Sequence, residues 1–413
     1  MKYVYLDYAA GTPAHTIQDS TPTPNPSLKG RWTTQFGNPS SIHSPGVEAR
    51  SKLNEARRTL AKVLNCYDYE VYFMPNSTYS IATALTAGRD GTIITSNIEH
   101  PAVLENLNKK SETNEYDNDK NIILKVEENG ILKGSSLREA LNKIEILKNK
   151  EKILVTIMYA NNEIGVIQPV KEISTLAKKN GILYFSDAVQ AVGKIPVDVN
   201  KDGIDIMAFT AHKMYGPKGI GSLYVRRKNP RVKVTAQMDG GGHERGMRSG
   251  TLNVPGIVGF GKACELARLE MADDAIRLSK LRDKLENSLM QLEEAYVNGN
   301  REHRLPHVTN ISFKYVEGEG LLMGFNKNIA LSSGSACTSA SLEPSYVLKA
   351  LGLGDDLAHS SLRFGLGRFT TEDQIDYTIK AVSETVLKLR DMSPLWEMFK
   401  EGVDMDKIEW ASH

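Results

Sequence analysis

Strand-like and helix-like segments alternate along residues 71–225, and this alternation restricts the fold more than any other feature. Segments with helical spacing of apolar residues, such as Ser136 to Leu147 and Ile173 to Lys179, separate the strands. Strands joined by helices form a mostly parallel sheet flanked by helices, so the sequence predicts an α/β fold. The predicted strands are Val71 to Met74, Thr92 to Ser96, Ile122 to Val126, Ile153 to Tyr159, Leu183 to Phe185, Ile204 to Phe209 and Gly221 to Val225.

The sequence after residue 240 predicts a second, smaller unit. Gly240-Gly241-Gly242 is a glycine run typical of a hinge. Ile257 to Glu293 has the spacing of a long helix, and Thr309 to Phe313 and Ala330 to Ser332 resemble strands. A helix is expected to start at Gly320 to Gly324. This mixture predicts a smaller α+β unit.

Three segments outside the strands have clear local signals. Val47 to Leu64 carries apolar residues at helical spacing and predicts the first long helix. Ser20 to Trp32 contains Pro22, Pro24 and Pro26 and predicts a loop. The lysine- and asparagine-rich stretch from Asn108 to Asn121 predicts an exposed loop.

The composition excludes several classes of protein. With 413 residues, the chain is long enough for two or three structural units. It carries 51 Lys and Arg against 50 Asp and Glu, and this net charge of +1 attracts neither nucleic acid nor a membrane surface. No transmembrane-length apolar run or targeting peptide is evident, and three cysteines fit a reducing compartment. We expect a cytoplasmic protein, with the matrix of a mitochondrion-related organelle as the alternative.

Polar residues directly follow four of the predicted strands. They are His100, Asn162, Asp187 and Lys213. Because the carboxyl ends of parallel strands meet at one edge of a sheet, ligands of open α/β sheets bind there. Recurrence at equivalent positions is a stronger signal than any single motif, so we expect one site that contains all four residues.

The segment around Lys213 and the end of the preceding strand allow more than one interpretation. Thr210, His212 and Lys213 lead into a glycine-proline loop that lets the backbone pass close to a ligand. Lys213 is a phosphate contact, a Schiff-base nucleophile or a solvated lysine of a glycine turn. Asp187 pairs with the protonated ring nitrogen of pyridoxal phosphate, or caps a helix that starts at Ala188. His100 stacks on a flat ring, or bonds to the backbone at the strand end.

Further candidates lie outside these strand ends. Ser77 and Thr78 precede a helix, where they cradle a phosphate or form an ordinary N-cap. Arg363 lies in a buried-looking run and suits a substrate carboxylate or an internal ion pair.

The three cysteines differ in their surroundings. Cys337 lies among small residues in Ser332 to Ala340, which suits a reactive thiolate on a mobile loop. Cys66 and Cys264 lie in apolar helical patterns, and we predict that they pack in the core.

Together these motifs resemble the pyridoxal-phosphate-dependent cysteine desulfurases of the NifS/IscS type, and most closely the IscS branch that supplies sulfur for iron–sulfur clusters. The similarity runs from Leu6-Asp7-Tyr8 to the end of the chain. It is densest at Asn161 to Gln168, Ser186 to Gln190, His212 to Gly219, Gly240 to Thr251 and Ser332 to Tyr346. The family implies the aminotransferase fold type I and the conversion of L-cysteine to L-alanine with sulfur transfer.

The resemblance assigns a role to each candidate. Lys213 would hold the cofactor covalently and then act on the α-proton. His100 would stack on the cofactor ring and relay protons. Cys337 would take the sulfur as a persulfide, and it would serve as a transient iron–sulfur ligand shared with a scaffold protein. The other implied contacts are to the cofactor ring from Asp187, Gln190 and Asn162, to its phosphate from Ser77, Thr78, Thr210, His212 and the neighbouring subunit's Thr251, and to the substrate carboxylate from Asn162 and Arg363.

The resemblance also implies an organisation and a set of partners. Residues 15–255 would form the large cofactor-binding domain, and residues 1–14 with 256–413 the small domain. The small domain would carry the mobile Cys loop at about residues 332–343 and a tail at about residues 393–413 that docks the scaffold. The expected partners are L-cysteine, a second copy of the chain, the iron–sulfur scaffold and other sulfur acceptors, with no nucleic acid and no membrane.

The chain departs from the family at the phosphate cradle. Asn76 stands where the family has glycine, and Tyr79 where it has an acidic residue. Asn adopts a left-handed backbone only at some cost, so we expect weaker cofactor binding or a less stable fold. The alternatives on this scaffold are a selenocysteine lyase, a class V aminotransferase, or a cofactor-poor scaffold subunit. Cys337 argues against the aminotransferase, which needs no thiol.

Overall fold

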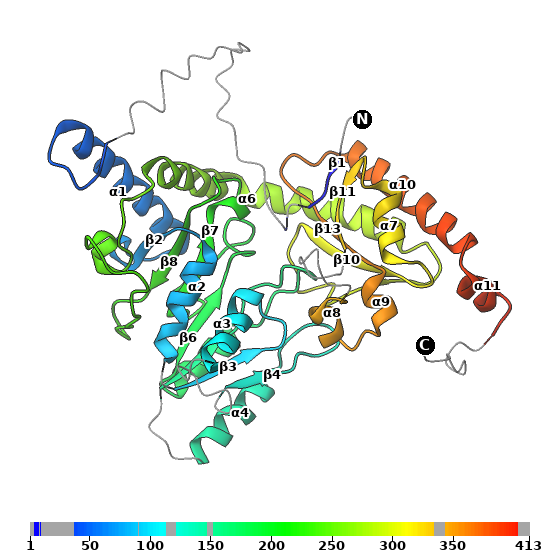
Figure 1. Ribbon diagram of the computed structural model, residues 1–413, viewed down its shortest axis with the longest axis horizontal. Coiled ribbons are helices and arrows are strands. Elements are labelled where there is room, and N and C mark those ends of the chain that lie inside the picture. Colours follow the sequence, from blue (N-terminus) through cyan, green and yellow to red (C-terminus); the bar gives the residue numbers. More distant parts are fainter. Residues whose placement is uncertain are drawn as a thin grey trace, which may run out of the picture.

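The computed structural model describes residues 4–7, 9, 37–89, 91–112, 121–146, 152–333 and 343–403. These ranges form two sheet-containing parts, with the long helix α6 running from one to the other (Figure 1). The strands are β1 (Val4–Tyr5), β2 (Val71–Met74), β3 (Thr92–Ser96), β4 (Ile122–Leu124), β5 (Ile153–Thr156), β6 (Leu183–Asp187), β7 (Ile206–Thr210), β8 (Gly221–Val225), β9 (Ala295–Val297), β10 (Val308–Phe313), β11 (Ile329–Ala330), β12 (Ser332–Ser333) and β13 (Ser361–Gly365).

Helices account for most of the remaining described chain. Four of them are short 3-10 turns: η3 (Asp68–Glu70), η4 (Thr86–Gly88), η6 (Ala211–Lys213) and η7 (His243–Gly246). The α-helices are α1 (Ser44–Leu64), α2 (Ser77–Leu85), α3 (Pro101–Glu112), α4 (Gly134–Ile146), α5 (Val170–Lys179), α6 (Val254–Leu289), α7 (Gly318–Phe325), α8 (Tyr346–Ala350), α9 (Asp355–His359), α10 (Glu372–Asp391) and α11 (Pro394–Lys400).

The larger sheet has seven strands in the order β2-β8-β7-β6-β5-β3-β4. β8 pairs antiparallel with β2 and β7, and the pairs from β7 to β4 are parallel. The predicted mostly parallel sheet is therefore confirmed. Its order places the carboxyl ends of β7, β6, β5 and β3 next to one another, which brings the predicted site residues to a single edge.

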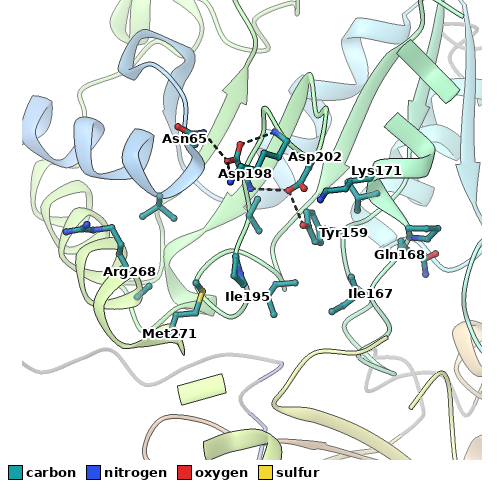
Figure 2. Close-up of a pocket in the computed structure, with 18 of the residues that line it drawn as sticks. Asn65, Tyr159, Ile167, Gln168, Lys171, Ile195, Asp198, Asp202, Arg268 and Met271 are labelled. Atoms are coloured by element: carbon teal, nitrogen blue, oxygen red, sulfur yellow. Dashed lines mark hydrogen bonds and ion pairs between the residues drawn. The ribbon is translucent and has the colours of Figure 1, made fainter. Parts of the chain in front are cut away.

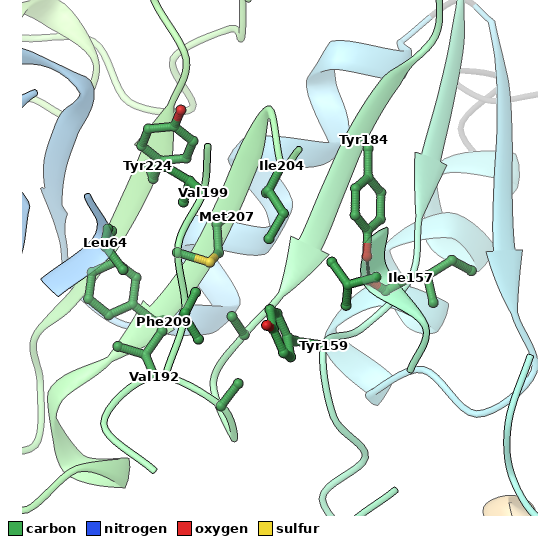
Figure 3. Close-up of a cluster of buried hydrophobic side chains, with 14 of the residues drawn as sticks. Leu64, Ile157, Tyr159, Tyr184, Val192, Val199, Ile204, Met207, Phe209 and Tyr224 are labelled. Carbon is green, nitrogen blue, oxygen red and sulfur yellow. Dashed lines mark hydrogen bonds between the residues drawn. The ribbon is translucent and has the colours of Figure 1, made fainter. Parts of the chain in front are cut away.

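Alternate strand residues fill two cores, one on each face of this sheet. Phe73 in β2 and Phe209 in β7 pack with α1, α5 and the first half of α6. Figure 3 shows part of this core, where Met207, Phe209 and Tyr224 meet Leu64 of α1. Met74 in β2 packs on the opposite face with α2 and α3. Because side chains of a strand alternate between faces, strands that are apolar at every position need helices on both sides.

The smaller part is built on the antiparallel sheet β12-β13-β10-β9. Its core joins β10 and β13 to α7, α10 and the second half of α6, through residues such as Leu285 and Phe364. The N-terminal strand β1 pairs with β11, so the start of the chain lies against this part. Asp7 forms a bridge with Gly365 at the end of β13. This position matters for the site described below.

Some boundaries differ from those predicted. Ser77 and Thr78, predicted to precede a helix, are its first residues, because α2 begins at Ser77. The helix α3 extends to Glu112, into the stretch predicted as an exposed loop. The predicted loop at residues 20–32 lies outside the described residues. No helix in the described ranges combines the length and apolarity needed to cross a membrane.

Candidate active site

The four predicted strand-end residues lie at one edge of the larger sheet. His100 follows β3, Asn162 follows β5, Asp187 ends β6, and Lys213 ends the short turn η6 after β7. β3, β5, β6 and β7 are consecutive neighbours in the sheet. Electrostatic coupling joins His100, Asp187 and Lys213. The sequence prediction that these groups form one site is therefore supported by the geometry of the sheet.

The backbone carbonyl of Ala9 lies inside this site. Lys213 Nζ donates a hydrogen bond of 2.6 Å to Ala9 O, and Gln190 Nε2 donates one of 3.0 Å to the same oxygen. One carbonyl therefore holds the amine and the amide side by side. The sequence gives no signal for this contact, because a backbone oxygen has no residue signature and Ala9 lies 204 positions from Lys213.

Asp187 and His100 form an acid–base pair of opposite exposure. Asp187 is buried and its Oδ1 accepts a 3.0 Å hydrogen bond from Val189 N, whereas His100 is exposed. Burial raises the pKa of Asp187, and the nearby His100 opposes that shift. Desolvation of its imidazole by the surrounding site lowers the pKa of His100 although part of the residue is exposed, and Asp187 opposes this shift. A cation bound beside Asp187 would favour its ionised form.

The backbone hydrogen bond predicted for His100 is present in the structure, and its stacking on a ring stays a prediction. Its Nδ1 accepts a hydrogen bond of 3.0 Å from Ala102 N, which anchors the imidazole at the start of α3. The exposed imidazole thus has a fixed orientation.

The alternative role of Asp187, as the cap of a helix starting at Ala188, is not seen. That helix is absent, because residues 188–192 form turns.

Thr210 and His212 are tied to each other at the end of β7. Thr210 Oγ1 donates to Ile220 O at 3.0 Å and lies 3.1 Å from His212 Nδ1. Burial, with Lys213 and Lys218 nearby, lowers the pKa of His212 to about 4, so this imidazole is neutral at pH 7.

The N-terminus of α2 corrects one expectation. Asn76 has φ −166° and ψ 177°, an extended backbone that any residue adopts, so no left-handed strain arises there. Its Oδ1 accepts a hydrogen bond of 2.8 Å from Tyr79 N and caps the helix. Ser77 and Thr78 are the first two residues of α2. Their position at a helix start suits a phosphate.

Arg363 is held by an internal ion pair. Its Nη2 lies 2.9 Å from Asp7 Oδ1 and 2.9 Å from Ser332 Oγ, and its Nη1 donates to Asn162 O at 3.1 Å. Arg363 is buried, and its Nε has no partner among the described residues. The cation therefore lies beside Asn162, with an N–H group still available. Sequence reasoning placed Arg363 near Asn162 but missed Asp7.

Two predicted residues are not placed by these contacts. Thr251 is exposed in the loop before α6. Cys337 lies outside the described residues, so its predicted reactivity and metal role remain predictions. The described residues contain no cluster of three or more His, Cys, Asp or Glu arranged to hold a metal.

The other two cysteines have surroundings that favour packing. Cys264 is buried in the core against α1, and Cys66 packs at its border. Burial raises the pKa of both thiols, which keeps them protonated and unreactive.

Sequence reasoning also missed Glu99, the residue before His100. Glu99 is fully buried; its Oε1 accepts hydrogen bonds from Ser96 Oγ at 2.7 Å and Met158 N at 2.9 Å. Its Oε2 has no partner among the described residues. Burial raises the pKa of Glu99 to about 8. Tyr346, at the start of α8, donates to the Glu99 carbonyl at 2.6 Å.

Comparisons with known proteins agree with this geometry. The family model for aminotransferase class V matches residues 4–378. The chain is 47% identical over 417 aligned residues to the cysteine desulfurase IscS of Serratia proteamaculans strain 568, covering 99% of each chain. This chain belongs to the class V aminotransferase family.

Two solved structures share the fold of this chain. The X-ray structure of a NifS-like protein from Rickettsia africae matches with a TM-score of 0.80 at 30% identity, covering 93% of this chain and 99% of that one. A structure described as SspA in complex with cysteine matches with a TM-score of 0.73 at 28% identity, covering 89% and 100%. The predicted α/β aminotransferase fold is therefore confirmed.

Proposed function

We propose that this protein is a cysteine desulfurase that converts L-cysteine to L-alanine and transfers the sulfur to Cys337 as a persulfide. The observation that carries the proposal is the convergence of His100, Asp187, Gln190 and Lys213 at adjacent strand ends. The 47% identity to IscS over 99% of the chain specifies the reaction. The Cys337 thiolate would bond to the substrate sulfur as the bond from that sulfur to Cβ breaks. The electron pair of the broken bond would stay on the carbon fragment, which takes up a proton and leaves as alanine.

The residues present fit pyridoxal 5′-phosphate. Lys213 Nζ supplies an amine, Asp187 a buried carboxylate and His100 an exposed imidazole. Ser77, Thr78, Thr210 and His212 would hold the phosphate, joined by Thr251 of a second copy. Gln190 and Asn162 would contact the ring. When bound, the cofactor supplies an electron sink for the charge that forms at the substrate Cα.

Each residue then has a defined task. Arg363, beside Asn162, would bind the substrate carboxylate through its guanidinium. Lys213 Nζ would take the α-proton. In the structure it lies beside the Gln190 amide, and both donate to the Ala9 carbonyl. His100, held by Ala102 N, would stack on the ring and relay protons.

The organisation of the protein follows from the same proposal. We propose residues 15–255 as the large domain and residues 1–14 with 256–413 as the small domain. The core of the smaller sheet supports a separate small domain, whereas the first half of α6 and α8 pack in the core of the larger sheet. A homodimer would complete the phosphate site through Thr251. We expect L-cysteine as substrate, transfer of sulfur to an iron–sulfur scaffold and other acceptors, and a cytoplasmic location, as the bacterial relatives suggest.

The tail is the proposed scaffold contact. In α11 none of the residues is buried; Phe399 stacks on Tyr315, and the Trp396 ring lies tilted against the same tyrosine. A cluster-assembly assay with and without residues 393–413 tests this part. Deletion should abolish transfer to the scaffold and leave alanine production unchanged.

Alanine and sulfide release from L-cysteine, with pyridoxal phosphate and a thiol reductant present, tests the activity. The wild-type protein should produce both, and Lys213→Ala should produce neither. Absence of alanine from cofactor-loaded wild-type protein would rule out the desulfurase function.

Cys337→Ala is the matched control, because it removes the proposed sulfur acceptor and leaves the described site unchanged. It should bind the cofactor, visible as a yellow absorbance band, and produce no persulfide. Wild-type turnover by this variant would reject Cys337 as the acceptor.

A further inference from the structure

A cleft of about 810 Å³ lies behind the candidate active site, on the face of the large sheet that α1, α5 and α6 cover. Its size is typical of sites for small molecules. None of the residues proposed for the cofactor or the substrate lines it. Figure 2 shows its walls, which come from the end of α1, the loop after β5, the segment after Gly193, and α6.

The floor of this cleft is apolar. Ile167, Ile195 and Met271 lie along the lower side of the cleft in Figure 2, and Val63, Val197 and Ala267 also line it. These side chains come from four segments that are distant in sequence. An apolar surface of this kind favours a hydrocarbon or aromatic body.

Two of the three carboxylates of the cleft accept hydrogen bonds from the protein itself. Asp198 accepts hydrogen bonds from Asn65 Nδ2 and from the backbone of Lys201, and Lys201 Nζ lies 3.6 Å from it. Asp202 Oδ2 accepts from Tyr159 Oη at 3.1 Å. Glu172, the third acid, is turned toward Gly134 at the start of α4. Asp198 and Asp202 therefore have internal partners, and Glu172 is the one acid of the cleft whose side chain makes no hydrogen bond or ion pair among the described residues.

The cations at the rim are not paired in this way. Lys62, Lys171 and Arg268 are exposed and form no ion pair within the described part of the chain. Arg268 lies on one side of the cleft and Lys171 on the other (Figure 2). A molecule on the apolar floor would thus meet positive charge at the rim, so the available charge favours an anion.

We infer that this cleft binds a small amphiphilic anion, with a hydrocarbon or aromatic body on the floor and one sulfonate, phosphate or carboxylate head at the rim. The site is distinct from the cofactor site but close to it. Tyr159, Ile167 and Gln168 belong to the segment that carries Asn162, and Tyr159 N donates to Asp187 O at 2.8 Å.

The test uses the full chain loaded with pyridoxal phosphate, so that the phosphate site is filled. The probe is 8-anilinonaphthalene-1-sulfonate, excited directly and titrated by fluorescence. We expect saturable binding of one dye per chain. Octyl sulfate should displace the dye at about tenfold lower concentration than octyltrimethylammonium, which has the same chain and the opposite charge.

Three variants locate the binding. Arg268→Glu reverses a rim charge and should weaken dye binding by about tenfold, because it replaces an attraction to the anionic head with a repulsion. Lys280→Glu, the same change elsewhere on α6 and outside the cleft, should leave binding unchanged. Met271→Trp should fill the floor and abolish binding.

Two results would overturn the inference. One is equal displacement by the anionic and cationic octyl compounds. The other is wild-type affinity in Arg268→Glu, whose exposed position allows the variant to fold even if Met271→Trp does not.

Discussion

Arg363 Nη2 lies 2.9 Å from Asp7 Oδ1, so the arginine proposed for the substrate carboxylate already has a carboxylate partner from the N-terminal segment. Asp7 also accepts a hydrogen bond of 2.7 Å from Ser332 Oγ, at the last described strand before Cys337. The pair fixes the guanidinium against Asn162, and the unpaired Nε remains for a second carboxylate. The planar fork is what allows one cation to serve two anions.

Arg363→Lys should therefore raise the KM for L-cysteine much more than it lowers kcat. The lysine ammonium pairs with Asp7 but lacks the second N–H edge of the guanidinium that would bind the substrate carboxylate. The loss of one charge-assisted hydrogen bond, about 1.5–3 kcal/mol, corresponds to a tenfold to hundredfold rise in KM. Steady-state alanine production measures both constants. Arg226→Lys, at the ion pair with Asp205, is the control. An unchanged KM in Arg363→Lys would leave Arg363 as an internal ion pair only.

Glu99→Gln should make the protein more stable at alkaline pH. The pKa of Glu99 is raised to about 8 by burial, so the folded protein binds a proton that the unfolded chain releases above about pH 4.5. Its contribution to stability is thus complete below that pH and is lost as the pH rises toward 8, by up to about 1.4 kcal/mol per unit. Glutamine keeps the acceptor for Ser96 and Met158 without the charge.

Urea unfolding of Glu99→Gln and wild type across this pH range measures the effect. The difference in midpoint should grow in favour of the variant from about pH 5 to pH 8. Glu55→Gln, an exposed position on α1, provides the baseline. A constant difference across the range would show that Glu99 does not titrate in this window.

Local pattern was sufficient to predict the sheet and the residues at its strand ends. Each strand of the large sheet is a short apolar run, and Asp187 and Lys213 follow such runs directly, so chain order alone brought them to one edge. The contacts of Ala9 and Asp7 could not be predicted in this way. They join positions 204 and 356 residues apart, and only the pairing of β1 with β11 places the N-terminal segment there.

Residue type also failed to predict the backbone conformation at position 76. Asn in place of glycine at position 76 predicts strain only if the backbone is left-handed, and φ at Asn76 is −166°. The φ angle of Asn76 is set by its position as the N-cap of α2, and the conformational preference of a single residue does not predict that position.

Asn76→Gly should consequently change little. The substitution restores the residue of the family pattern but removes the cap on Tyr79 N, at a cost of a few tenths of a kcal/mol. Cofactor affinity should stay within about threefold, because no left-handed strain is relieved. Titration of cofactor-free protein with pyridoxal phosphate measures it. Tightening by an order of magnitude would mean that the asparagine side chain obstructs the phosphate.

Tyr215, two residues after Lys213, is clamped between two cations. Lys194 Nζ lies 4.2 Å from the ring centroid, and the Arg368 guanidinium carbon lies 4.6 Å from it. Tyr215 also has φ 66°, a left-handed backbone that a tyrosine rarely adopts. Lys194 is buried, and its Nζ has no hydrogen-bond partner among the described residues. The clamp thus compensates for strain beside Lys213 and places a cation in the core.

Lys194→Met should stabilise the protein at neutral and acid pH and lose that advantage at alkaline pH. Burial, assisted by Arg368, lowers the pKa of Lys194 to about 7. The unfolded chain therefore binds one more proton between about pH 7 and 10.5, and wild-type stability rises with pH in that window. Methionine keeps the length of the side chain and contacts the ring through sulfur, without the charge. The variant's excess unfolding free energy should shrink as the pH rises, opposite in sign to the trend for Glu99→Gln. An excess that is constant with pH would place the lysine charge in contact with solvent.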